Sequence, residues 1–93
     1  MCEYLWDAHV VAVASDTPGT ELWPVDTSDM SKPFSFLHRV LIGQFGMAIG
    51  ELWDLERFAD DCAQDGVHEA FLVSSPLYVR GGIGSPPNVT VFK

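Results

Sequence analysis

The hydrophobic pattern of this chain consists of short apolar runs separated by polar, turn-forming segments. The run at 8–14, AHVVAVA, is rich in valine and ends at Ser-Asp-Thr-Pro-Gly, which predicts a buried strand followed by a loop. Proline, glycine and small polar residues at 17–33 predict that this loop is long. Further short strands are predicted at 47–52, 69–73, 77–80 and 88–92.

Two helices are predicted where apolar residues recur at intervals of three and four. The apolar positions are Leu37, Val40, Leu41 and Phe45 in the first helix, and Leu55, Phe58, Ala59 and Cys62 in the second. The first helix, at 35–45, begins at a serine, and the second, at 54–64, begins at an aspartate, both good N-caps. Gly46 and Gly66 follow them as stop signals.

These elements mix without a strict strand-helix-strand alternation, which favours an α/β (α+β layered) fold. Apolar strands with no polar face suggest a mixed central sheet that is covered on both sides, with two helices. A chain of 93 residues is one domain or part of one, near the lower edge of independent stability.

Charge and composition exclude several classes of function. The formal net charge is −8, with only five Lys and Arg, so a nucleic-acid partner is not expected. The chain has no apolar stretch long enough to span a bilayer, and its first residues do not resemble a signal peptide. Two cysteines do not make a disulfide framework, so the expected location is cytoplasmic, without a membrane partner.

The residues alone leave the chemistry open. His38 lies on a predicted helix, where it could be a surface histidine, and Glu51 lies at a predicted strand end beside apolar neighbours. Asp16 and Glu21 flank the loop after the first strand, so they are weak candidates for lining a pocket. His9 lies within an apolar run and is expected to be a core histidine.

Three specific segments occur in this order: WDAHVVAVASDTPGTE, FLHRVLIGQFGMAIGELWDLERFADDC and SSPLYVRGGIGSPPN, and together they cover most of the chain. In this order they resemble the C-terminal part of the cyclase family, the kynurenine formamidase-like metal-dependent hydrolases, so 1–93 is interpreted as a single partial domain. The shared features include a helix with a histidine, a Gly-x-x-x-Gly-Glu segment and a Gly-x-Gly-Ser-Pro turn. The resemblance implies part of the family's swivelling β/β/α-like fold.

The resemblance also implies an activity and a site. Relatives hydrolyse carbon–nitrogen bonds of small-molecule amides, as in arylformamidase, which converts N-formylkynurenine to kynurenine in tryptophan catabolism. They use a divalent metal, zinc or manganese, and usually form dimers or larger homo-oligomers. By this resemblance His38 is a catalytic residue and a metal ligand, and Glu51 is a metal ligand. Asp16 and Glu21 stay weak candidates for substrate binding.

One part of the family pattern is missing. Relatives place most metal ligands in a His-x-x-x-His-x-Asp motif, which does not occur in these 93 residues. We therefore expect the chain to be the C-terminal segment of a hydrolase, inactive alone. Two alternatives stay open: a non-catalytic fragment that oligomerises or binds a partner, and a truncated gene product without function.

Overall fold

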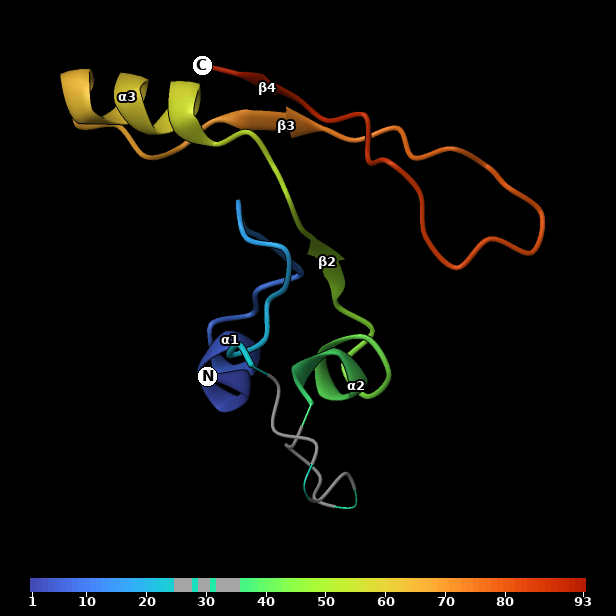
Figure 1. Cartoon of the computed structure of the whole chain (residues 1–93). Coiled ribbons are helices and arrows are strands. Elements are labelled where there is room, and N and C mark those ends of the chain that lie inside the picture. The colour runs from blue at the N-terminus through green and yellow to red at the C-terminus, as the bar shows by residue number, and fades with distance from the viewer. Residues whose placement is uncertain (25–27, 29–30, 32–35) are drawn as a thin grey trace. The chain divides into compact units, whose positions relative to one another are not determined.

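The computed structural model describes residues 1–24, 28, 31 and 36–93 of the chain. These residues form two compact units, 1–55 and 56–93. The first unit contains α1 (Cys2–Asp7), β1 (Ala12–Ala14), α2 (Leu37–Leu41) and β2 (Ala48–Gly50) (Figure 1). The second contains α3 (Glu56–Asp65), β3 (Phe71–Val73) and β4 (Thr90–Phe92).

In the first unit, β1 and β2 form a parallel pair in which Val13 lies opposite Ile49. Parallel neighbours require a crossover, and α2 lies within that connection. The pairing continues past both strands, because the N–H of Trp53 donates to the carbonyl of Ser15 and the N–H of Leu52 donates to the carbonyl of Thr17. The chain that leaves β2 is therefore held beside the loop that leaves β1.

The core of this unit lies between α1, α2 and the start of β2. Val40 and Leu41 have no exposed surface, and Cys2 and Met47 are also buried. Several half-buried apolar residues pack around them: Leu5, Val10, Val13, Leu37, Phe45 and Ile49. Burial of this stripe of α2 fixes the helix against the sheet, so it also fixes the polar residues on the rest of the helix.

The second unit pairs a helix with an antiparallel hairpin. Phe71 of β3 lies opposite Phe92 of β4, and their rings are 6.2 Å apart. Lys93 follows β4 and forms ion pairs with Asp61 (2.9 Å) and Asp65 (2.8 Å) of α3, so the hairpin end is tied to the helix. Burial opposes the positive charge of Lys93, but the hydrogen bonds that its ammonium group donates to both aspartates prevail and raise its pKa.

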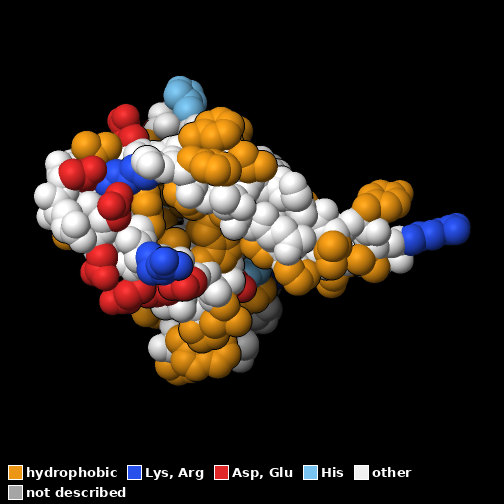
Figure 2. All heavy atoms as spheres, turned by 90° about the horizontal axis from the view of Figure 1, so that it is seen from above, with side chains coloured by type: hydrophobic (Ala, Val, Ile, Leu, Met, Phe, Trp, Pro, Cys, Tyr) orange, Lys and Arg blue, Asp and Glu red, His pale blue; other side chains and the backbone are white. Residues whose placement is uncertain are grey.

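Many apolar side chains are exposed, and hydrophobic atoms reach the surface in Figure 2. Every side chain of β3 and β4 is exposed, including Phe71 and Phe92. A strand pair with open edges and exposed apolar faces can add another strand. Self-association, expected from the family resemblance, stays a prediction.

The α/β class and both predicted helices are confirmed, with some differences in detail. The strands form two separate pairs, one parallel and one antiparallel, in place of one central sheet. Helix α1 was not predicted, because six residues without a side-chain cap give too little periodicity. Residues 77–80 form no strand. The predicted serine cap at 35 lies outside the described residues.

Two further predictions concerned His9 and the glycines that follow the predicted helices. His9 is exposed and has a left-handed φ of 57°, so the prediction of a core histidine is wrong. It lies in the turn between α1 and β1, before the apolar run becomes extended. Gly46 and Gly66 both have positive φ, at 68° and 72°, as helix-ending glycines commonly do.

Among the described residues, no helix has the length and apolar character that crossing a membrane requires.

Candidate functional site

Three predicted polar residues meet in the first unit: Glu21, His38 and Glu51. Glu21 lies in the loop after β1, His38 is the second residue of α2, and Glu51 directly follows β2. Packing of Val40 and Leu41 orients α2, and the parallel pairing of β1 and β2 brings Glu51 beside that loop. Residues separated by up to 30 positions in the chain thus form one cluster.

His38 and Glu51 are in direct contact. The distance from Nε2 of His38 to Oε1 of Glu51 is 3.1 Å, and both side chains are 27% exposed. The same oxygen accepts hydrogen bonds from the backbone N–H of Thr20 (2.8 Å) and from the Thr20 hydroxyl (3.2 Å). The expected proximity of the two predicted ligands is therefore observed, with Thr20 fixing the carboxylate. Their role as metal ligands stays a prediction.

Glu21 lies on the other side of the His38 ring. Its Oε1 is 2.6 Å from Nδ1 of His38 and accepts the backbone N–H of His38 at 2.7 Å. Its Oε2 accepts the backbone N–H of Leu37 at 2.8 Å. Burial of Glu21 raises its carboxyl pKa, but the hydrogen bonds from the His38 ring and the two backbone N–H groups outweigh it and leave the pKa below 4.5.

The lowered pKa of Glu21 predicts a pH-dependent contribution to stability. Above the ordinary value of 4.5, folded and unfolded chains both carry the carboxylate, so the contribution is fully present. As the pH falls below 4.5, the unfolded chain binds the proton first, and the free energy of unfolding decreases until the folded carboxyl is also protonated. Urea denaturation across this pH range should show a shallower decrease in Glu21→Gln than in the native chain.

Asp16→Asn is the matched control for this measurement. Asp16 is an exposed carboxylate in the same loop, and in the described residues it makes no hydrogen bond to His38 or Glu51. Its removal should leave the pH dependence below 4.5 unchanged. Equal slopes for the native chain and Glu21→Gln would contradict the assigned hydrogen bonds.

The remaining candidates lie apart from this cluster. Asp16 is exposed, and its predicted role in substrate binding is untested. His68 is exposed and Cys62 is buried, as expected from their places in the sequence. The sequence pattern did not reveal the contact of Glu21 with His38, because it joins a residue outside any helix or strand to one 17 positions later, and no periodicity encodes such a contact.

The donor set fits a divalent metal in part. Two atoms bound to one zinc ion at about 2.0–2.1 Å in a tetrahedral arrangement lie about 3.3 Å apart, close to the separation of His38 Nε2 and Glu51 Oε1. The second nitrogen of His38 contacts a carboxylate, as is usual for metal-binding histidines. No group of three or more His, Cys, Asp or Glu within the described ranges is arranged to hold a metal. His38 and Glu51 are therefore two candidate donor atoms, and metal binding by them stays a prediction.

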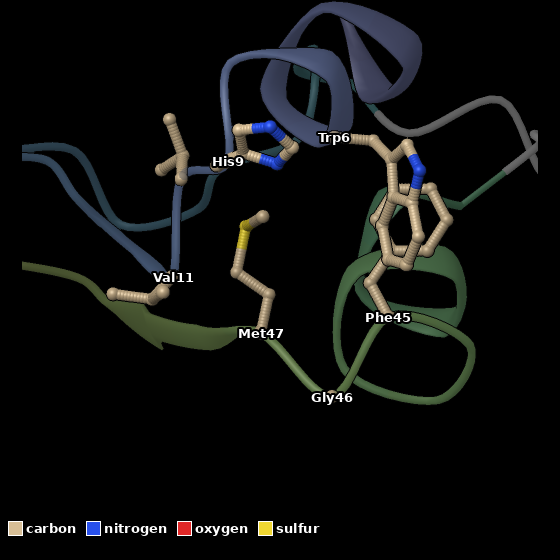
Figure 3. A pocket seen from close by; sticks show the side chains of 7 residues that line it. Trp6, His9, Val11, Phe45, Gly46 and Met47 are labelled. Atoms are coloured by element: carbon tan, nitrogen blue, oxygen red, sulfur yellow. The ribbon is translucent and has the colours of Figure 1, made fainter.

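A separate pocket of about 300 Å³ lies between the α1–β1 turn and the segment before β2. Trp6 and Phe45 form one wall with ring centroids 4.8 Å apart, and Met47 points toward His9 (Figure 3). Its lining includes none of Glu21, His38 and Glu51, so this pocket is not part of the polar cluster.

Comparison with known proteins relates the chain to one class of enzyme. No protein-family model matches it, and no curated protein sequence matches it. A crystal structure described as that of a novel cyclase matches with 36% sequence identity and a TM-score of 0.79. The match covers 99% of this chain and 28% of the cyclase chain. This chain is therefore related to a cyclase in sequence and fold along nearly its whole length, and it spans about a quarter of the cyclase's length.

Proposed function

We propose that this chain is a segment of a cyclase-family, metal-dependent amide hydrolase, in which His38 and Glu51 are two of the metal ligands. The observation that supports this most directly is the 3.1 Å contact between His38 Nε2 and Glu51 Oε1. The related cyclase structure supports the family, because the similarity includes the segments that hold both residues.

The proposed chemistry assigns a role to each polar side chain. A divalent metal at this point would lower the pKa of a bound water and polarise the substrate carbonyl. Glu51 supplies a carboxylate oxygen that Thr20 holds in place, and His38 supplies an imidazole nitrogen. The alternative role for His38 is that of a catalytic residue that accepts and returns a proton during hydrolysis, which requires that its Nε2 is not bound to the metal.

The substrate class that we propose is a formamide of an aromatic amine, such as N-formylkynurenine. In this reaction water adds to the formyl carbon, the carbon–nitrogen bond breaks, and formate and the free amine leave. Support for this class comes from the resemblance of the three sequence segments to kynurenine formamidase-like proteins. The complete enzyme would then act in tryptophan catabolism.

We propose that the remaining ligands belong to a part of the enzyme outside these 93 residues. Catalytic zinc usually has three protein ligands and an open position for water. The described residues provide two, and the His-x-x-x-His-x-Asp pattern does not occur in this sequence. The related cyclase is more than three times as long as the matched region, which leaves room for these ligands.

Zinc titration of the chain by isothermal calorimetry tests the proposed ligands. We expect weak binding, because two ligands form an incomplete site. His38→Ala and Glu51→Gln should each reduce zinc affinity by at least about tenfold, since the first removes the imidazole nitrogen and the second replaces a charged carboxylate oxygen with a weaker, neutral amide oxygen. His68→Ala is the control, because it removes an exposed histidine outside the cluster and should leave the affinity unchanged. Equal affinities for all four proteins would contradict the site.

A turnover assay tests the proposed incompleteness. The chain with added zinc or manganese should not hydrolyse N-formylkynurenine above the rate without protein. Turnover that His38→Ala abolishes would show that these 93 residues complete a working site, and the proposed need for outside ligands would be wrong.

A further inference from the structure

We infer that Glu21 is a positioning residue that keeps the His38 proton on Nδ1, so that Nε2 presents its lone pair toward Glu51. The part of the inference that concerns a metal rests on the proposed function. The part that concerns the imidazole tautomer rests on the contacts of Glu21 alone and can be tested without metal.

Glu21 is held more firmly than a surface carboxylate would be. Its side chain is only 7% exposed, and its two oxygens accept three hydrogen bonds, from the Leu37 N–H, the His38 N–H and the His38 ring. Two of these donors belong to the α2 backbone, so the carboxylate is fixed to the same helix that carries the imidazole. The position of Oε1 relative to Nδ1 is therefore set by the first turn of α2.

The His38 ring is restrained on a second side. The Phe36 ring stacks against it with a centroid distance of 5.1 Å and an interplanar angle of 14°. Stacking limits rotation of the imidazole out of its plane, while the bond to Glu21 limits rotation within that plane. The two contacts together aim Nε2 at the Glu51 carboxylate.

The two distances indicate which nitrogen holds the proton. The Nδ1 to Oε1 distance of Glu21 is 2.6 Å, typical of a short bond to a charged acceptor, whereas Nε2 lies 3.1 Å from Glu51. Either neutral tautomer leaves one ring lone pair facing a carboxylate oxygen, and the repulsion is weaker at 3.1 Å from Glu51 than at 2.6 Å from Glu21, so the proton is favoured on Nδ1. Glu51 already accepts two hydrogen bonds from Thr20, so it depends less on a proton from His38.

The tautomer can be measured directly by long-range ¹H–¹⁵N NMR of ¹⁵N-histidine-labelled chain without metal, above about pH 8, where an imidazole is ordinarily neutral. We expect His38 to be mainly in the Nδ1–H form, whereas the exposed His9 and His68 should favour the Nε2–H form, as free histidine does. A native His38 that is mainly Nε2–H would overturn the inference, whatever any variant shows.

Glu21→Gln tests the cause. An amide has one acceptor oxygen in place of two, so it cannot satisfy all three donors, and the Nε2–H fraction of His38 should rise severalfold. Asp16→Asn removes an equal charge from the same loop without touching His38, and it should leave the tautomer unchanged. An unchanged His38 tautomer in a folded Glu21→Gln chain would overturn the role of Glu21.

Zinc titration of the same proteins separates this inference from the proposed function. Zinc affinity should fall by about 10–100-fold in Glu21→Gln, which is the usual effect of losing a carboxylate that is hydrogen-bonded to a metal-binding histidine. The affinity of Asp16→Asn should equal that of the native chain. A native chain that binds no zinc but shows the expected tautomer shift would contradict the metal site and support the positioning role. Zinc affinity that is equal in native and Glu21→Gln chains would overturn the link between Glu21 and the metal.

Discussion

Replacing Leu41 with alanine is expected to lower the free energy of unfolding of the first unit by about 2–5 kcal/mol, the usual cost of truncating a fully buried leucine. Leu41 has no exposed surface and packs with Val40 and Met47 in a small core. A unit of this size has little stability to lose. Urea denaturation followed by circular dichroism should therefore show a large decrease in the midpoint, or a first unit that is already unfolded in buffer.

Ile42→Ala is the control for this experiment. Isoleucine has the same number of carbon atoms as leucine, but Ile42 is 52% exposed and follows Leu41 directly in the chain. Its truncation should cost less than about 1 kcal/mol, because little buried surface is lost. A similar loss of unfolding free energy in the two variants would contradict a core in which Leu41 is buried and Ile42 is not.

Replacing Gly50 with alanine is expected to cost about 1–3 kcal/mol, because the added methyl group overpacks the turn after β2. A Cβ at this position would lie 2.3 Å from Nε1 and 2.6 Å from Cε2 of Trp53. The backbone N–H of Trp53 is bonded to the carbonyl of Ser15, so the backbone that carries the indole is held in place and only rotation of the side chain could relieve the contact. Displacement of this turn should also move Glu51, so zinc affinity and the urea midpoint should decrease together.

Gly19→Ala is the matched control in the same unit. A Cβ there would meet Glu51 Oε1 at 4.0 Å, which is an ordinary contact, and no backbone strain arises. This change should be neutral or slightly stabilising, because alanine restricts the unfolded chain. A Gly50→Ala chain as stable as Gly19→Ala would show that the indole does not lie over Gly50.

The sequence predicted the elements whose signals are local. Both helices were found from apolar spacing, and Gly66 follows α3 directly, whereas α2 ends at Leu41, before the predicted end at 45 and before Gly46. The separation of the strands into two pairs was not predicted, because strand pairing depends on contacts between distant residues. A six-residue helix at the N-terminus was missed, because its stability comes from burying Cys2 and packing Leu5 rather than from its own pattern.

The candidate site was predicted unevenly. His38 and Glu51 were singled out by the resemblance of their segments to one family, not by their spacing alone. Glu21 was assigned only a weak role in substrate binding, whereas the structure places it against the His38 ring. That contact joins a loop residue to a helix 17 positions later, and no residue pattern encodes such a closure.

The positions of the tryptophans have a spectroscopic consequence. Trp6, Trp23 and Trp53 all belong to the first unit, and the second unit has none. Intrinsic indole emission will therefore report on residues 1–55 and will change little when α3 and its hairpin unfold. A fluorescence curve that coincides with an amide signal would mean that the two units melt as one cooperative body, and curves that separate would mean that they melt independently.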